Sequence, residues 1–120
     1  MKNQHIVRRF FFAWTGLRAS FSSERSFRAH IAVFACVIVL LLFTRPVPLW
    51  WAIMLLTSGM MMAVELINTA VEKLSDHLHP DWGPIIGIVK DTLAGAVLVT
   101  CATGALVLVA FFWSLYAVGR

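Results

Sequence analysis

The chain has 120 residues, of which 60% are hydrophobic and only 13% are charged, and its mean hydropathy is +0.83. A soluble chain of this size could not bury so much apolar surface in one core, so we expect an integral membrane protein with about three spans of about 20 residues and no separate soluble domain. The net charge of +4 does not indicate nucleic-acid binding, because the basic residues flank apolar segments instead of forming a polar groove.

The N-terminal region is basic and amphipathic. It holds six of the ten lysine and arginine residues: Lys2, Arg8, Arg9, Arg18, Arg25 and Arg28. An apolar set recurs in it at a spacing of three or four residues: Ile6, Phe10, Trp14, Leu17 and Phe21. Because these positions share one helical face, we expect a surface helix at about 5–22 that lies on an anionic leaflet. A secretory signal is disfavoured, since the long apolar run begins only after Arg28.

Three apolar segments follow, and each is long enough to cross a bilayer. We expect these spans at about 29–48, 49–71 and 92–116. Pro46 and Pro48 end the first helix and force an extended connection. The predicted fold class is therefore an all-α membrane protein, with one amphipathic surface helix and three transmembrane helices.

The polar segment between the second and third spans is expected to be a cytoplasmic loop at about 72–91. Residues 80–88 hold two prolines and two glycines, which is a loop composition, and Asp91 is predicted to cap the third span. Six basic residues precede the first span, whereas only Arg45 stands in the first connection. The positive-inside rule then places the N-terminus and the 72–91 loop in the cytoplasm.

Glu65 is an ionisable residue inside an apolar stretch, where such groups are costly and usually functional. At 3.6 residues per turn its helix face also carries Thr69, Glu72 and Asp76, with Asn68 at the border. Neighbouring carboxylates need a cation or shared protons, and hard oxygen ligands of this kind suit Mg²⁺. The alternative is a helix end with solvated charges, which accounts for Asp76 and Glu72 but not for Glu65.

Two further acids stand at the membrane level of Glu72 in the expected topology, namely Glu24 before the first span and Asp91 before the third. With Lys90 they make the parts of a site for a Mg²⁺-bound nucleotide. Two simpler explanations stay open: Glu24 pairs with Arg28 one turn along a helix, and Asp91 is only a helix cap. A P-loop is excluded, since the glycines before Lys90 have the wrong spacing and follow no strand.

Four blocks of the sequence resemble the family of small prokaryotic diacylglycerol and undecaprenol kinases, and together they cover nearly the whole chain. They are WTGLRA at 14–19, ERSFR at 24–28, ELINTAVE at 65–72 and KD at 90–91. The resemblance implies a homotrimer in the bacterial inner membrane, with active sites shared between neighbouring subunits. It also implies ATP-dependent phosphorylation of a lipid hydroxyl at the cytoplasmic face, with diacylglycerol as the favoured acceptor and undecaprenol as the alternative.

The resemblance implies site residues by position. Glu65 would take the proton from the lipid hydroxyl, and Asn68 would position catalytic groups. Glu24 and Glu72 would hold a Mg²⁺ ion that bridges the nucleotide phosphates. The implied nucleotide-site residues are Phe12, Glu24, Glu72, Asp76, Asp81, Trp82, Gly83, Lys90 and Asp91. The implied lipid contacts are Trp14, Arg18, Ser26, Phe27, His30 and Glu65.

Three positions depart from the pattern of the enteric diacylglycerol kinases: His30 replaces an acid, Phe12 a tyrosine and His5 an arginine. The histidine at His30 is more similar to the undecaprenol kinase branch. A different class of function is a non-catalytic membrane subunit or a small proton-coupled carrier, with Glu65 as its buried ion site. A carrier has no need of a second carboxylate cluster at the surface, whereas a nucleotide site does.

Overall fold

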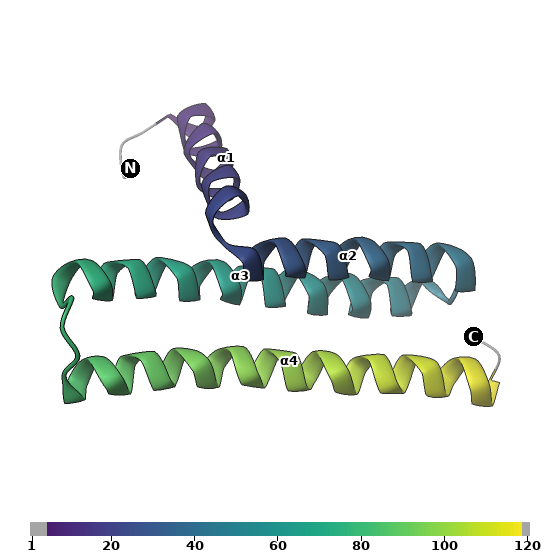
Figure 1. Cartoon of the computed structure of the whole chain (residues 1–120). Helices are drawn as coiled ribbons and strands as arrows, with labels where there is room; N and C mark the ends of the chain where they lie inside the picture. The colour runs from purple at the N-terminus through teal and green to yellow at the C-terminus, as the bar shows by residue number, and fades with distance from the viewer. Residues whose placement is uncertain (1–4, 119–120) are drawn as a thin grey trace.

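The computed structural model describes residues 5–118, and this part of the chain folds into four helices (Figure 1). They are α1 (Ile6–Ser23), α2 (Arg25–Thr44), α3 (Pro48–Leu78) and α4 (Pro84–Val118). Figure 1 shows α2, α3 and α4 running along one another, while α1 leaves the start of α2 at a steep angle. α3 packs against both α2 and α4, so it forms the centre of the bundle.

The predicted fold class is confirmed. Three helices of the described chain, α2, α3 and α4, are long and apolar enough to cross a membrane. α3 has 31 residues and α4 has 35. At 1.5 Å per residue these helices measure about 46 Å and about 52 Å, against about 30 Å for the hydrocarbon core. Part of each must therefore extend beyond the apolar layer.

The segment after the second span is more helical than the sequence indicated. α3 continues to Leu78, and the connection to α4 is only residues 79–83. The loop predicted at 80–88 is wrong from Pro84 onward, because proline is well suited to the first helical position, where its missing N–H is not needed. Asp91 lies two turns inside α4, so the prediction that it caps a helix is also wrong.

A single extended residue, Glu24, separates α1 from α2. Arg28, in the first turn of α2, folds back over this elbow. Its Nη1 donates hydrogen bonds to the carbonyl oxygens of Phe21 at 2.7 Å and Ser22 at 3.0 Å. These carbonyls belong to the C-terminal turn of α1, where unpaired acceptors and the helix dipole favour a cation. Arg28 therefore fixes the angle at which α1 leaves the bundle.

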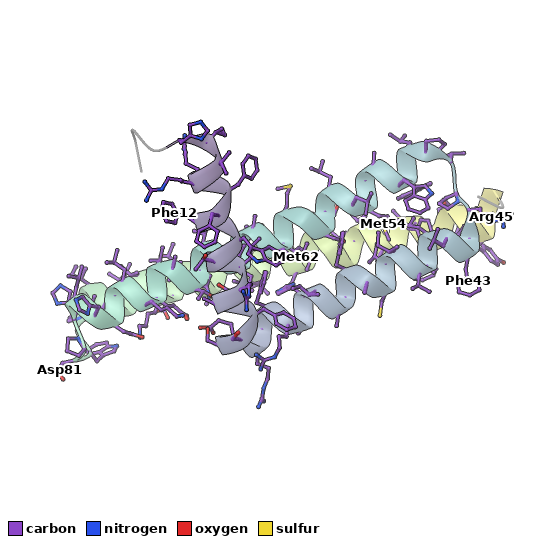
Figure 2. All side chains as sticks on the ribbon, turned by 90° about the horizontal axis from the view of Figure 1, so that it is seen from above. Phe12, Phe43, Arg45, Met54, Met62 and Asp81 are labelled. Carbon is purple, nitrogen blue, oxygen red and sulfur yellow. The ribbon has the colours of Figure 1, made fainter. Side chains whose placement is uncertain are left out.

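A cluster of buried apolar side chains lies at the opposite end of the bundle, next to the connection between α2 and α3. Leu41, Met54 and Phe111 form this cluster, one from each long helix. The rings of Trp50 and Phe111 meet edge-on, with centroids 5.3 Å apart. Figure 2 shows Met54 inside the bundle, with Phe43 and Arg45 at this end. The cluster sets the register of α2 and α4 against α3, and so determines which polar residues meet further along.

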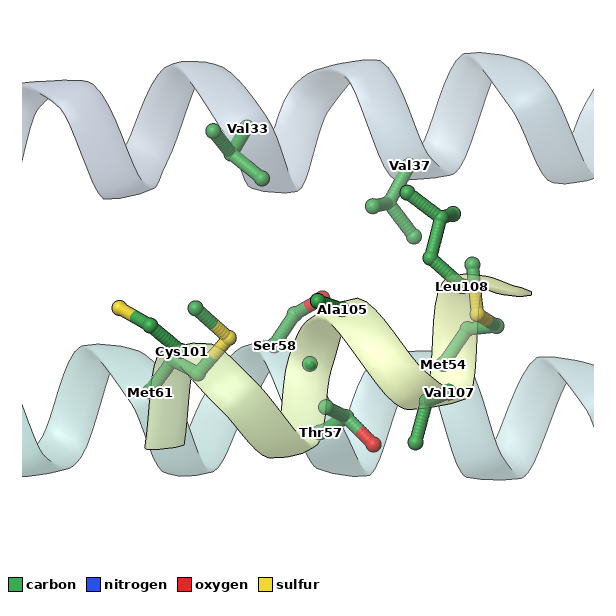
Figure 3. Close-up of a pocket in the computed structure, with 11 residues that line it drawn as sticks. Val33, Val37, Met54, Thr57, Ser58, Met61, Cys101, Ala105, Val107 and Leu108 are labelled. Atoms are coloured by element: carbon green, nitrogen blue, oxygen red, sulfur yellow. The ribbon is translucent and has the colours of Figure 1, made fainter. Parts of the chain in front are cut away.

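Midway along the bundle, a cleft of about 200 Å³ opens between the three long helices (Figure 3). Its lining is mostly apolar, with Thr57, Ser58 and Cys101 as the polar or thiol-bearing members. Gly104 of α4 also lines this cleft and faces Met61 of α3. A Cβ added there would stand 2.8 Å from Sδ of Met61. A larger residue at this position would therefore displace the end of the Met61 side chain.

Candidate active site

The buried acid of the bundle is Glu65, which faces α2 from α3. Its side chain is 8% exposed, and its Oε2 atom lies 3.7 Å from Nε2 of His30, whose side chain is 16% exposed. Thr69, one turn further along α3, is also buried. The alternative of a solvated helix end therefore does not apply to Glu65.

A second contact joins α3 to the elbow between α1 and α2, about two turns along α3 from Glu65. Nζ of Lys73 stands 3.6 Å from Oε1 of Glu24. The simpler explanation that Glu24 pairs with Arg28 is wrong, because the Arg28 guanidinium binds the last carbonyl groups of α1 instead. Glu72 is exposed on the neighbouring position of α3, and about 10 Å of helix separates it from Glu65.

A third contact joins α3 to α4 close to the 79–83 connection. Nζ of Lys90 donates a hydrogen bond of 2.8 Å to Oδ1 of Asp76. The structure thus brings together two residues that the sequence assigned to the nucleotide site. Trp82 in the connection lies against Gly87, where an added Cβ would stand 3.2 Å from the indole Nε1.

The polar residues of the site are therefore arranged in three levels along α3. The deepest is Glu65 with His30, the next is Lys73 with Glu24, and the outermost is Asp76 with Lys90. The other residues expected here are not paired across helices. Asn68 and Gly83 are half-buried, while Glu72, Asp81, Trp82 and Asp91 are exposed.

A Mg²⁺ site can be tested against the donors present. Within residues 5–118, no group of three or more His, Cys, Asp or Glu side chains is placed to hold a metal ion. Mg²⁺ at a phosphate site, however, is commonly bound through one or two carboxylates, with waters and phosphate oxygens completing the shell. Glu24 and Glu72 supply donors of this kind, and Glu24 already attracts the Lys73 ammonium. The donor chemistry therefore fits Mg²⁺ held jointly with a nucleotide.

An apolar cavity of about 640 Å³ lies where α1, α2 and α3 meet. Its lining is Trp14, Leu17, Arg18, Phe21, Ser22, Phe27, Ile31, Phe34 and Met62. Three expected lipid contacts are among these residues, whereas Ser26 is exposed and outside the lining. Ile31 adjoins His30 in sequence and Met62 stands one turn before Glu65, so the cavity borders the deepest level. Its volume falls in the range of ligand pockets, and its walls suit a hydrocarbon chain.

One expected nucleotide contact stays apart from the others within this chain. Phe12 is exposed on α1, and Figure 2 shows it well away from Asp81 at the far end of α3. The single chain therefore does not unite the nucleotide-site residues that the resemblance implies.

Sequence reasoning did not find two relationships. In the sequence Lys73 is simply a basic residue after the second apolar segment, and nothing in its spacing indicates a contact with Glu24. His30 was assigned to the lipid, and its approach to Glu65 was not foreseen either. Both contacts join helices that are distant in sequence, so no local spacing could have indicated them.

Residues 11–112 match the family described as prokaryotic diacylglycerol kinase. The match takes in most of α1, all of α2 and α3, and most of α4. It includes every residue assigned above to the three levels and to the cavity. The chain belongs to the prokaryotic diacylglycerol kinase family. The resemblance inferred from the four sequence blocks is therefore confirmed.

Three similar proteins illustrate the range of this family. The diacylglycerol kinase of Synechocystis sp. is 32% identical over 99 residues, which are 82% of this chain and 57% of that protein. The undecaprenol kinase of Bacillus subtilis is 30% identical over 102 residues, 82% of this chain and 83% of that protein. The diacylglycerol kinase of Escherichia coli strain K12 is 28% identical over 116 residues, with 91% and 89% covered. The chain thus spans little more than half of the Synechocystis protein and most of the other two.

Membership in the prokaryotic diacylglycerol kinase family, with three helices able to span a membrane, makes this chain a multi-pass membrane protein. It is a lipid kinase of the diacylglycerol kinase type. Such an enzyme uses a nucleotide as phosphoryl donor and a lipid as acceptor.

Proposed function

We propose that the protein transfers the γ-phosphoryl group of ATP to a lipid hydroxyl, with Mg²⁺, at the cytoplasmic face of the bacterial inner membrane. The observation that supports this most directly is the buried carboxylate of Glu65 beside an apolar cavity of about 640 Å³. The favoured acceptor is diacylglycerol, which would give phosphatidic acid. Undecaprenol, which would give undecaprenyl phosphate, is the alternative.

The depth of Glu65 suits a general base for a lipid hydroxyl. Such a hydroxyl lies at the headgroup level, so its base has to stand just inside the leaflet. His30, which faces Glu65, is six residues into α2 from the elbow, or about 9 Å along the helix axis. The proton of the hydroxyl passes to the carboxylate while the lipid oxygen bonds to the γ-phosphorus. The bond from that phosphorus to the β–γ bridging oxygen breaks, and ADP leaves. Asn68, one turn from Glu65, would orient these groups.

The outer two levels suit the nucleotide. Glu24 and Glu72 would hold Mg²⁺, which when bound neutralises charge on the phosphates. Lys90 is an exposed cation on α4 and would contact a phosphate. Further nucleotide contacts would come from Phe12, Asp76, Asp81, Trp82, Gly83 and Asp91. Phosphoryl transfer depends chiefly on positioning and charge, so a helix cluster can supply it without a separate nucleotide-binding domain.

The lipid would enter at the junction of α1 and α2. The cavity would take a hydrocarbon chain between Trp14 and Phe27, with Arg18 at the headgroup level. Ser26 and His30 would border the headgroup. α1 would lie on the cytoplasmic leaflet, because its basic residues are attracted to anionic lipids and the positive-inside rule favours that side.

We further propose that the active enzyme is a homotrimer with sites shared between subunits. Phe12 and the 79–83 connection are apart within one chain. A neighbouring subunit could bring the α1 residues of one chain to the outer levels of another. The largely exposed apolar surface of α4 offers the area for such contacts.

The proposal is tested with purified protein in mixed micelles, with labelled ATP and Mg²⁺. Diacylglycerol and undecaprenol are offered separately at equal surface concentration. We expect transfer to diacylglycerol and little to undecaprenol, and loss of transfer in Glu65→Gln with ATP binding retained. His77→Gln, on the exposed last turn of α3, serves as a control expected to keep full activity.

Three results would contradict parts of this proposal. Transfer to undecaprenol alone would mean that undecaprenol, and not diacylglycerol, is the acceptor, and the proposed phosphoryl transfer would still hold. Transfer to neither lipid by folded protein would favour a proton-coupled carrier that uses Glu65 as its ion site. Turnover at the wild-type rate in Glu65→Gln would remove Glu65 as the base.

A further inference from the structure

The pair of His30 and Glu65 differs in its burial from the two ion pairs that lysines make with Glu24 and Asp76. Both side chains are largely enclosed, at 16% and 8% exposure. In the Lys73–Glu24 pair the lysine is 60% exposed, and in the Lys90–Asp76 pair neither side chain is below 45%. A pair removed from water in this way is energetically costly, and an exposed pair is not. The enclosure of His30 with Glu65 therefore calls for a reason.

A buried base also has to lose the proton that it accepts before the next turnover. Glu65 has one titratable side chain within ion-pair distance in the described chain, and that side chain is His30. Further along α3, Glu72 is about 10 Å of helix away from Glu65, and Lys73 is engaged with Glu24 at the next level. Arg18 of α1 borders the cavity, but it is permanently protonated and cannot receive a proton. His30 is the available acceptor.

The position of His30 favours action through Glu65 over direct lipid binding. Phe27 and Ile31 on the same helix line the cavity, whereas His30, like Glu65, stands next to the cavity and is not among its lining residues. Its Nε2 instead faces the Glu65 carboxylate at 3.7 Å. This separation is somewhat longer than a hydrogen bond, and such contacts commonly shorten when substrate completes a site.

We propose that His30 receives from Glu65 the proton that the lipid hydroxyl gives up. The inference rests on the proposed function, because Glu65 has to act as the base. The hydroxyl proton first moves to a Glu65 oxygen as the new O–P bond forms and the β–γ bridging O–P bond breaks. The carboxyl O–H bond then breaks, and the lone pair of neutral Nε2 binds the proton. The products are a carboxylate and an imidazolium, and the imidazolium passes its proton to water as the phospholipid leaves.

His30 is thus a positioning residue that restores the ionised form of Glu65. The loss of such a residue and the loss of a lipid contact predict different changes in kcat and KM. If His30 bound the lipid, its loss would raise the KM for lipid. If it resets Glu65 after phosphoryl transfer, its loss slows a step that follows the chemistry, so kcat and both KM values fall together and kcat/KM stays nearly unchanged. A slow proton transfer would also become visible as a larger solvent deuterium isotope effect on kcat.

The experiment uses the full-length protein in mixed micelles with ATP, Mg²⁺ and whichever lipid the wild type phosphorylates. We expect His30→Gln to lower kcat by about 100-fold, the lower end of the range that proton transfer by a positioned group contributes. Both KM values should fall with kcat, so that kcat/KM stays within about twofold of the wild-type value, and the isotope effect on kcat should increase. In His30→Ala, added imidazole should restore part of the lost rate. His77→Gln is the matched histidine control.

Several outcomes would overturn the proposal. A wild-type kcat in His30→Gln would do so, as would a raised lipid KM with kcat retained. The proposal is also overturned if added imidazole does not raise the rate of His30→Ala. Thermal unfolding in detergent shows that each variant is folded, and His30→Asn replaces His30→Gln if the latter is not. A wild type that phosphorylates no lipid would instead refute the proposed function, so the two failures are distinguishable.

Discussion

The Nζ atom of Lys73 lies 3.6 Å from Oε1 of Glu24. A lysine of α3 is therefore paired with the carboxylate that we propose as a metal ligand. Mg²⁺ has to displace this ammonium. We expect Lys73→Met to lower the Mg²⁺ concentration needed for half-maximal activity, because one competing cation is removed. The pair is largely exposed, so the free energy of unfolding should change by less than about 1 kcal/mol.

The measurement for Lys73 is a Mg²⁺ titration of activity, together with Mn²⁺ binding followed by electron paramagnetic resonance without nucleotide. Lys73→Arg keeps the positive charge and is the matched control. A higher metal requirement in Lys73→Met would contradict the prediction, and would mean that the lysine supports metal binding instead of competing with it.

Glu72 offers the second proposed metal ligand, on the position next to Lys73. We expect Glu72→Gln to raise the Mg²⁺ requirement, because an amide oxygen carries no full charge for a hard cation. Glu65→Gln is a useful comparison, since it should abolish transfer without changing Mn²⁺ binding. If the metal titration of Glu72→Gln matches that of the wild type, Glu72 does not belong to the metal site.

Nζ of Lys90 on α4 donates a hydrogen bond of 2.8 Å to Oδ1 of Asp76 on α3. This bond keeps the Lys90 ammonium close to the 79–83 connection. We expect Lys90→Ala to raise the KM for ATP more than the KM for lipid, because the variant loses the cation that we propose as a phosphate contact. Lys90→Arg keeps the charge and should retain more of the ATP affinity. Steady-state kinetics with each substrate varied in turn give the KM values for ATP and for lipid in each variant. An unchanged KM for ATP in Lys90→Ala would remove Lys90 from the nucleotide site.

The helices and the buried acid could be predicted from the sequence, because each depends on local information. Glu65 stands out as a charge within an apolar run, and Pro46 and Pro48 mark the end of α2. The start of α4 was misjudged because Pro84 is equally suited to a turn and to a first helical position.

The partners across helices could not be predicted in the same way. Whether His30 meets Glu65 depends on the register of α2 against α3. That register is set by packing at the far end of the bundle, where Leu41 and Met54 are buried together. Helical periodicity assigns each residue to a face, but it does not say which residue of the next helix lies opposite.

Gly104 provides a test of the packing that sets this arrangement. In a helix, replacing glycine by alanine is ordinarily stabilising by about 1 kcal/mol. At Gly104 the added Cβ would stand 2.8 Å from Sδ of Met61, whereas at Gly95 nothing lies within 4 Å. We therefore expect Gly95→Ala to be neutral or stabilising and Gly104→Val to destabilise by about 1–3 kcal/mol, the usual cost of overpacking. Gly104→Ala should be milder, since the end of the Met61 side chain can shift.

Denaturant titration of the protein in micelles gives the free energies for this comparison. Adding Met61→Ala to Gly104→Val should recover part of the loss, because the clash is with that side chain, and a double-mutant cycle isolates the coupling between them. If Gly104→Val and Gly95→Val destabilise equally and the cycle shows no coupling, the α3–α4 contact at Gly104 is not tight. The alignment of Lys90 with Asp76, which depends on the same two helices, would then need another explanation.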